Sequence, residues 1–169
     1  MKNFAVDLES LIPRLRRYAR ALTQHPARAD DLVQDTLERA WTRRMQWQAG
    51  SDLRAWTFAI MHNVFINSLR RFEAEVVPDR YFEEGLPFAQ DVLLDLERAF
   101  ARLVPEQRTV LLLISLEDLS YQQVSLVLGV PVGTVMSRLA RARAALRALM
   151  EGMPALEPSS IRPVLKVVK

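Results

Sequence analysis

The sequence predicts an all-α protein that consists of two small helical domains joined by an acidic linker. Half of its 169 residues are apolar, which is enough to fill a packed core. Along most of the chain these apolar residues recur at spacings of three and four, as they do on one face of an α-helix. Only 5 glycines are present, and no long run alternates between apolar and polar residues as a half-buried strand does.

The first helix is expected over about Val6 to Thr23. Its buried stripe has apolar or aromatic residues at helical spacing: Leu8, Leu11, Leu15, Tyr18 and Leu22. Pro13 lies inside this stretch and predicts a kink or a restart of the helix. A short break should follow, and Ala29 or Asp30 should begin the second helix with acidic residues in its first turn.

The second helix should extend over residues 30–46. Its inner stripe is expected to contain Val33, Leu37, Ala40, Trp41 and Arg44. The outer face should carry the polar residues Asp31, Gln34, Asp35 and Glu38. Gly50, Ser51 and Asp52 then form a break, in which Ser51 or Asp52 can cap the next helix.

The third helix is predicted over residues 53–71. It should bury Leu53, Trp56, Ile60 and Val64. The opposite side should be exposed and consists of Arg54, Phe58, His62, Asn63, Asn67, Arg70 and Arg71. Amides, aromatic rings and arginines on one face can hold single-stranded nucleic acid by stacking and by charge. The pattern fits equally well a solvated helix face whose aromatic rings pack inward.

Charge divides the chain into blocks. Residues 1–71 carry 12 basic and 7 acidic side chains, whereas residues 72–100 carry 2 basic and 8 acidic ones. This shift, with Pro78, Gly85 and Pro87 and no periodicity, predicts a linker over 73–90 between domains at 1–72 and 91–150. Residues 151–169 contain further prolines and are expected to form a C-terminal tail.

The second domain should begin with helices over about 91–103 and 105–117. A helix-turn-helix is then predicted over residues 119–149. Ser120 and Gln123 form a capping-box pattern, Gly129 suits a left-handed helix end, and Pro131 suits the start of the next helix. The second of these helices has one apolar stripe: Val132, Val135, Leu139, Ala142, Leu146 and Leu149.

Polar residues lie off this stripe. Thr134, Ser137, Arg138 and Arg141 share one side of the helix, so one face can pack while the other makes hydrogen bonds to an anionic partner. This arrangement is typical of a helix-turn-helix whose second helix enters the major groove of DNA. A helical hairpin with a solvated polar face would give the same pattern.

Several classes of function find no support in the sequence. The chain has no cysteine, which fits a reducing compartment. His25 and His62 are isolated from each other, and no phosphate-binding glycine loop or nucleophile motif is present, so we expect no enzyme, no metal and no cofactor. No run of ~20 apolar residues and no secretion signal is present, so we expect no membrane insertion and a cytoplasmic location.

Together, four stretches resemble a known family. They are DLVQDTLERAW (31–41), LRAWTFAIMHNVFINSLRR (53–71), LVPEQRTVLLL (103–113) and LSYQQVSLVLGVPVGTVMSRLARAR (119–143). Their order and spacing are similar to those of bacterial RNA polymerase sigma factors, and the short two-domain form resembles the extracytoplasmic-function (ECF) group. The resemblance covers about residues 5–149. It implies a promoter-specificity subunit that directs transcription initiation.

The resemblance also implies roles for individual residues. In the first domain, which matches region 2, the surface that docks on core RNA polymerase would include Leu32, Gln34, Asp35 and Glu38. The third helix and the loop before it, at about 44–52, would hold the non-template strand of the −10 element. Asn63 would contact an extruded base, and the nearby backbone would be held by Asn67, Arg70 and Arg71.

The second domain matches region 4. Its recognition helix would contact bases of the −35 element through Ser137, Arg138 and Arg141, and phosphates through Thr134 and Arg143. The expected partners are therefore core RNA polymerase and promoter DNA. An anti-sigma factor is expected from the resemblance alone.

Two other functions remain open at this point. A stand-alone helix-turn-helix regulator would bind duplex DNA without polymerase, usually as a dimer. A sigma-like decoy would bind an anti-sigma factor and no DNA. Such a decoy is expected to lose the arginines of the recognition helix, and this chain has Arg138, Arg141 and Arg143.

Overall fold

The computed structural model describes residues 3–75 and 91–152, and it gives side-chain surroundings for 3–71 and 95–152. These ranges contain α-helices, one short 3₁₀ helix and no strand, which confirms the all-α class. The elements are α1 (Phe4–Thr23), α2 (Pro26–Thr42), η1 (Arg44–Gln46), α3 (Leu53–Glu75), α4 (Asp91–Arg102), α5 (Pro105–Ser115), α6 (Tyr121–Leu128) and α7 (Val132–Met150).

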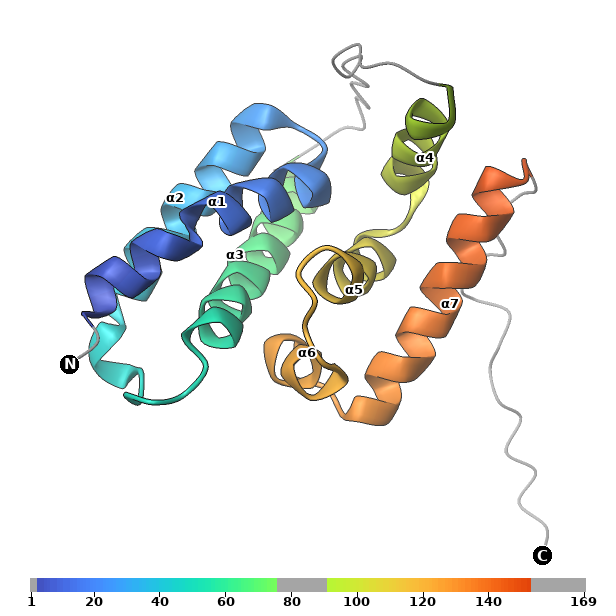
Figure 1. Cartoon of the computed structure of the whole chain (residues 1–169). Coiled ribbons are helices and arrows are strands. Elements are labelled where there is room, and N and C mark those ends of the chain that lie inside the picture. The colour runs from blue at the N-terminus through green and yellow to red at the C-terminus, as the bar shows by residue number, and fades with distance from the viewer. Residues whose placement is uncertain (1–2, 76–90, 153–169) are drawn as a thin grey trace, which may run out of the picture.

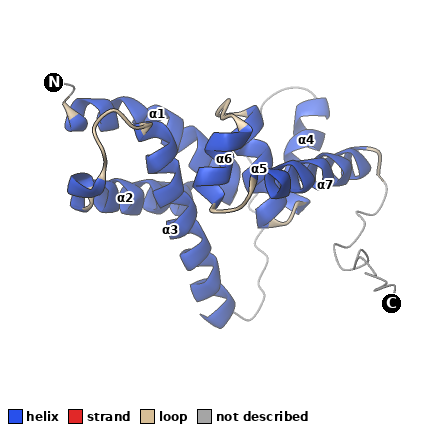
Figure 2. Ribbon diagram, turned by 90° about the horizontal axis from the view of Figure 1, so that it is seen from below, coloured by secondary structure: helices blue, strands red, loops and turns tan. Residues whose placement is uncertain are grey.

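The helices form two halves that lie side by side (Figure 1). The first half contains α1, α2 and α3, and the second half contains α4 to α7. Helices α5 and α6 face the first half, with α6 against α3 and α5 against α1, while α7 lies on the far side of α5 and α6. Figure 2 shows the same order from below, with α6 between α3 and α7.

The helices differ from the prediction in several places, and α2 ends at Thr42 instead of residue 46. The second helix begins at Pro26, because the His25 side chain accepts a hydrogen bond from the Arg28 N–H and Pro26 fits the first turn. Its first turn therefore contains no acidic residue. Helix α1 continues through Pro13 without a restart, and α3 runs to Glu75, past the predicted domain end at 72.

Other local predictions are confirmed. Asp52 caps α3 by accepting a hydrogen bond from the Ala55 N–H at 3.1 Å. Helices α4 and α5 lie where apolar periodicity placed them. Residues 76–90 of the linker predicted at 73–90, and residues 153–169 of the tail predicted at 151–169, lie outside the described residues. In the described part of the chain, no single helix is long and apolar enough to cross a membrane.

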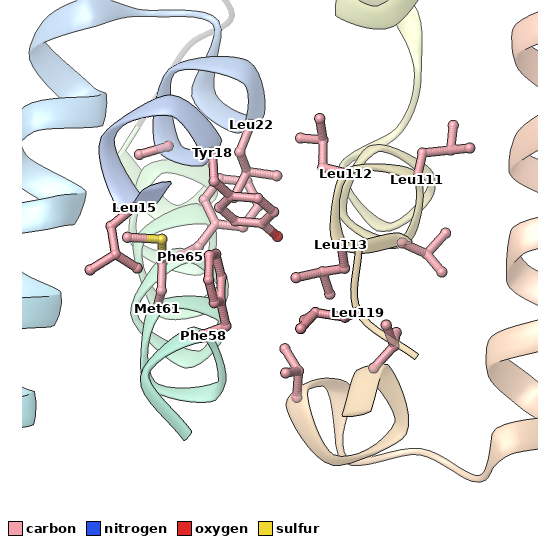
Figure 3. Close-up of a cluster of buried hydrophobic side chains, with 14 of the residues drawn as sticks. Leu15, Tyr18, Leu22, Phe58, Met61, Phe65, Leu111, Leu112, Leu113 and Leu119 are labelled. Atoms are coloured by element: carbon pink, nitrogen blue, oxygen red, sulfur yellow. The ribbon is translucent and has the colours of Figure 1, made fainter. Parts of the chain in front are cut away.

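One apolar core runs through both halves. From the first half it takes side chains of α1, α2 and α3, and those of α1 and α3 face leucines of α5 and of the loop that follows it (Figure 3). Phe58 and Phe65 are 1% and 4% exposed. The interpretation of Phe58 as an exposed stacking ring is therefore wrong. The apolar periodicity did not predict that Phe58 is buried, because α3 is covered on two sides: α1 and α2 pack on one side and α6 packs on the other.

Arg108, near the start of α5, forms hydrogen bonds with carbonyl groups of both halves. Its guanidinium donates hydrogen bonds to the carbonyl of Leu22 at 2.7 Å and to those of Phe100, Ala101 and Leu103 at 3.1, 2.9 and 2.9 Å. Burial lowers the pKa of Arg108. One side chain thus joins the last turn of α1 to the turn between α4 and α5.

We expect Arg108→Met to lower the free energy of unfolding by about 3 kcal/mol, because several carbonyls lose a charged donor in a largely buried site. Urea denaturation followed by circular dichroism measures this change. Arg102→Met is the matched control, since Arg102 is exposed on α4 and should change stability by less than about 0.5 kcal/mol. Equal effects of the two substitutions would contradict the role given to Arg108.

Candidate nucleic-acid and polymerase interfaces

The helix-turn-helix is set by local capping. Ser120 Oγ accepts a hydrogen bond from the Gln123 N–H, and the Gln123 side chain accepts one from the Ser120 N–H, which completes a capping box. Gly129 ends α6 with φ of 65°, a left-handed conformation that favours glycine. The chain bends by 97° between α6 and α7, within the range of helix-turn-helix motifs. The prediction for this segment is confirmed.

Helix α7 packs one face and exposes the other. Its buried residues are Val135, Leu139, Ala142, Ala145 and Leu149, and the helix packs on α4, α5 and α6. Ser137 and Arg141 are exposed on one flank of the outer face, where Arg141 Nε donates a hydrogen bond to the Ser137 carbonyl at 3.3 Å. Arg143 is exposed on the opposite flank, because a step of two residues turns a helix by about 200°.

Arg138 is not free on this surface. Its guanidinium pairs with Glu106 of α5 at 2.8 Å, and its side chain is 27% exposed. Thr134 is half-buried, and its carbonyl accepts a hydrogen bond from Ser137 Oγ at 3.0 Å. The structure therefore leaves Ser137, Arg141 and Arg143 as the accessible members of the predicted −35 set. Any contact of Arg138 with a base would first have to break its pair with Glu106.

The predicted −10 residues share one exposed face of α3. Asn63, Asn67, Arg70 and Arg71 are all exposed, at positions i, i+4, i+7 and i+8. The phenylalanines of α3 do not join them. An aromatic ring that could stack on a base is exposed on α2 instead. It belongs to Trp41, which is 49% exposed, and the Arg44 guanidinium lies 4.8 Å from the centre of this ring. Trp41 and Arg44 were predicted on the inner stripe of α2, and both are exposed.

The loop before α3 borders an open cleft of about 330 Å³. Its walls come from the start of α1 and from the loop: Asp7, Ser10, Leu11, Trp47, Gly50, Ser51, Asp52, Leu53 and Arg54. Trp47 Nε1 is buried there without a hydrogen-bond partner. The cleft is thus lined by carboxylates and an aromatic residue beside the loop at 44–52 that the resemblance associates with the −10 strand.

A second cleft, of about 750 Å³, lies between α1 and α2. Arg16 and Arg20 line it from α1, and Gln34 and Glu38 line it from α2 together with Asp30, Val33 and Leu37. Asp35 is exposed on α2. Leu32 is only 5% exposed, so its side chain packs in the core and is no part of an accessible docking surface. The other three residues remain predictions for polymerase binding.

His62 of the first half interacts electrostatically with Arg138 of the second half. It lies on α3, mostly buried, and its Nδ1 has no hydrogen-bond partner. Burial, and then the positive charge of Arg138 on α7, lower the pKa of His62 to about 4. The ring is therefore neutral near pH 7, and its protonation would place two cations against each other at the interface. Among the described residues, no cluster of potential metal ligands occurs.

Two buried or partly buried ion-pair sites were not predicted from sequence. Glu106 holds Arg138, and Glu117, with a fully buried side chain, contacts Arg14 and Arg17 of α1. Nothing in the spacing of these residues signals the contacts, because each one joins segments that are distant in the chain.

Family models match each half separately. The model described as the Sigma2 domain of PhyR matches residues 8–62, and the model described as Sigma-70, region 4, matches residues 93–146. The first match covers α1, α2 and much of α3, and the second covers α4 to most of α7.

One relative, matched over most of its length, shows the family. The chain is 37% identical over 150 residues to the ECF RNA polymerase sigma factor EcfG of Rhodopseudomonas palustris, across 85% of this chain and 83% of the relative. The chain belongs to the ECF group of RNA polymerase sigma factors. The sigma factor is also 36% identical over 127 residues to SigC of Mycobacterium tuberculosis, across 71% of this chain and 69% of that protein.

A solved structure with a similar fold includes a partner. The sigma factor RpoE of Bartonella quintana, crystallised with the anti-sigma factor NepR, is 32% identical to this sigma factor and superposes with a TM-score of 0.76. The match covers 89% of this chain and 98% of RpoE.

We expect the free energy of unfolding to fall by about 2 kcal/mol between pH 7 and pH 5 through His62 alone. A folded-state pKa of about 4, below the ordinary 6.5, means that the stabilisation is complete above pH 6.5 and is lost as the pH falls towards 4. Urea denaturation at both pH values measures it. His62→Gln should show a smaller loss over the same interval, and an identical loss would contradict the assignment.

Proposed function

We propose that this sigma factor binds core RNA polymerase and directs initiation by contacting a duplex −35 element and a melted −10 element. The observation that carries the proposal is the outer face of α7. Ser137 and Arg141 are exposed there on a helix whose opposite face is packed and whose direction is fixed by the capped turn after α6. A rigid helix with exposed hydrogen-bond donors suits the major groove.

The first half supplies the proposed −10 contacts. Asn63 and Asn67 present amides that can bond to base edges, and Arg70 and Arg71 lie on the same face for phosphates. The cleft beside Trp47 has room and polar groups for a base that has left the stack. This division assigns base recognition in duplex DNA to α7 and recognition of single-stranded DNA to α3 and the loop before it.

Polymerase would dock on the outer side of α2. Gln34 and Glu38 line the cleft between α1 and α2 together with the apolar residues Val33 and Leu37, and Asp35 is exposed on the same helix. Because core RNA polymerase acts on the chromosome, this function places the protein in the cytoplasm. An anti-sigma factor is a further proposed partner, supported by the relatives RpoE and CnrH, whose structures contain NepR and CnrY respectively.

A decoy for an anti-sigma factor is the second candidate. One observation favours it: the region 2 match is to the Sigma2 domain of PhyR, and PhyR of Bartonella quintana is named an anti-anti-sigma factor. The exposed arginines Arg141 and Arg143 favour the promoter-binding function instead.

Run-off transcription separates these functions. Core RNA polymerase is incubated with a pool of genomic promoters, with and without the sigma factor. New transcripts that require both proteins support the proposal. A chain that activates no promoter and does not co-purify with core polymerase contradicts it and leaves the decoy. Specific binding to duplex DNA without polymerase would instead indicate a stand-alone regulator.

We expect Arg141→Ala to reduce initiation from a −35-dependent promoter about tenfold, since a bidentate arginine–guanine contact contributes ~1–3 kcal/mol. Core binding should be unchanged. Arg102→Ala is the control, because it removes an exposed arginine of the same half outside the helix-turn-helix. Transcription from promoters with altered −35 elements measures the effect. Loss of core binding in Arg141→Ala would refute this division of roles.

Asp35→Arg should weaken binding to core polymerase about tenfold or more, because it reverses a charge on the proposed docking face. Glu9→Arg makes the same charge change on an exposed position of α1 and should leave the affinity unchanged. Fluorescence anisotropy of labelled sigma factor titrated with core polymerase gives both dissociation constants. An unaltered affinity for Asp35→Arg would place the docking surface elsewhere.

A further inference from the structure

Met136 is an exposed apolar side chain on the outer face of α7. It is 52% exposed, although methionine is among the residues that are most often buried. The other exposed residues within 132–141 are Gly133, Ser137, Ala140 and Arg141. Within this stretch Met136 is therefore the one large apolar side chain that α7 offers to a partner.

The same part of α7 offers little positive charge. Residues 132–139, the first two turns of the helix, contain one cation, Arg138, and its guanidinium pairs with Glu106 at 2.8 Å. The next cations, Arg141 and Arg143, come later in the helix. The start of α7 can thus contact a partner through the thioether of Met136 and the hydroxyl of Ser137, which suit base edges better than phosphates.

The chemistry of the major groove selects one base for the thioether. In a helix-turn-helix the N-terminal residues of the second helix contact base edges. Thymine presents a methyl group there, whereas adenine, guanine and cytosine are distinguished by hydrogen-bond donors and acceptors. The sulfur of methionine donates no hydrogen bond and accepts only weakly. Contact between Met136 and a thymine methyl group would remove both apolar groups from water.

The two flanks of the outer face suit different kinds of contact. Met136 and Arg143 are seven residues apart and lie on the same flank, because seven residues are about two turns. Ser137 and Arg141 lie on the other flank. One flank therefore combines two hydrogen-bonding side chains, while the other combines an apolar side chain near the helix start with a cation that can hold a phosphate. The three rotatable bonds of Met136 let it adapt to the groove.

We propose that Met136 is a specificity-determining residue that recognises the 5-methyl group of a thymine in the −35 element. The inference rests on the proposed function, because it requires −35 DNA against the outer face of α7. It adds the chemistry of one contact: an A·T pair is favoured at one position through burial of a methyl group, without a hydrogen bond and without a change of charge.

Replacement of thymine by deoxyuridine tests the contact. This change removes the methyl group and keeps every hydrogen-bonding group of the base pair. The template is a −35-dependent promoter found by run-off transcription, and each −35 thymine on either strand is replaced in turn. With full-length sigma factor and core polymerase, one replacement should lower initiation about fourfold, which is the change that burial of one methyl group supports.

Variants assign this response to Met136. Met136→Ala should initiate less from the thymine template and should no longer distinguish thymine from deoxyuridine. Met136→Leu keeps an apolar side chain and should retain the distinction. Alanine and leucine are strong helix formers, so neither change at this exposed position should disturb α7. Met150→Ala is the matched control, since Met150 is a 40% exposed methionine at the far end of the same helix; it should respond as the parent does.

Salt dependence separates a methyl contact from a phosphate contact. Binding of the holoenzyme to labelled promoter DNA is measured by fluorescence anisotropy at several salt concentrations. Met136→Ala should weaken binding equally at each concentration, because no counterion is released by an apolar contact. Arg143→Ala should reduce the slope of log affinity against log salt by about 1. A reduced slope in Met136→Ala would contradict the proposed contact.

The outcomes distinguish this contact from the proposed function. A parent that initiates from a −35-dependent promoter and responds to no deoxyuridine overturns the contact and leaves the proposed function in place. An equal response in the parent and in Met136→Ala also overturns it, because another residue would then contact the methyl group. If no promoter becomes active with core polymerase, the proposed function fails, and the contact with thymine fails with it.

Discussion

Helix α3 is buried on two sides, and this constraint places α1, α2 and α6 around it. Helices α1 and α2 cover one side and α6 covers the other, so Phe58, Met61 and Phe65 are all nearly inaccessible. Removing such side chains from water supplies most of the favourable free energy of packing, at about 25 cal/mol per Å². Only the strip with Asn63 and Asn67 is left for other contacts. The candidate −10 surface is thus what remains of α3 after both neighbours have packed.

Polar contacts decide how the halves meet. The apolar surfaces of α3 and α6 attract without direction, whereas Arg108, Glu117 and the pair Asp52 and Gln123 each require one alignment. Burying Glu117 costs several kcal/mol unless its partners are in place. The arrangement of the two halves is consequently specific without being strongly favoured.

Local features were predictable because they depend on neighbouring residues. The capping box at Ser120, the left-handed Gly129 and the packed stripe of α7 need no contact beyond the helix-turn-helix itself. Predictions of exposure failed where another segment of the chain packs on the residue. Phe58 was expected on the exposed side of its helix and is buried, as is Leu32, which the family resemblance had placed on a docking surface. Arg138 remains a predicted DNA contact, but in this structure it pairs with Glu106. A periodic pattern gives a residue's direction from its own helix, but it does not show which neighbour covers that direction.

The sequence by itself determined the helices, the helix-turn-helix, the blocks of charge and the membership of the ECF sigma factors, since these follow from short-range periodicity, capping chemistry and motif order. Only the tertiary structure decided which arginines are free. Arg141 and Arg143 remain exposed, whereas Arg14, Arg17, Arg54 and Arg108 are engaged by carboxylate or carbonyl groups from the opposite half. In sequence all of them are equivalent cations. Their roles differ because an arginine becomes structural only when folding brings an acceptor within hydrogen-bonding distance, and those acceptors lie 63 to 100 residues away in three of the cases.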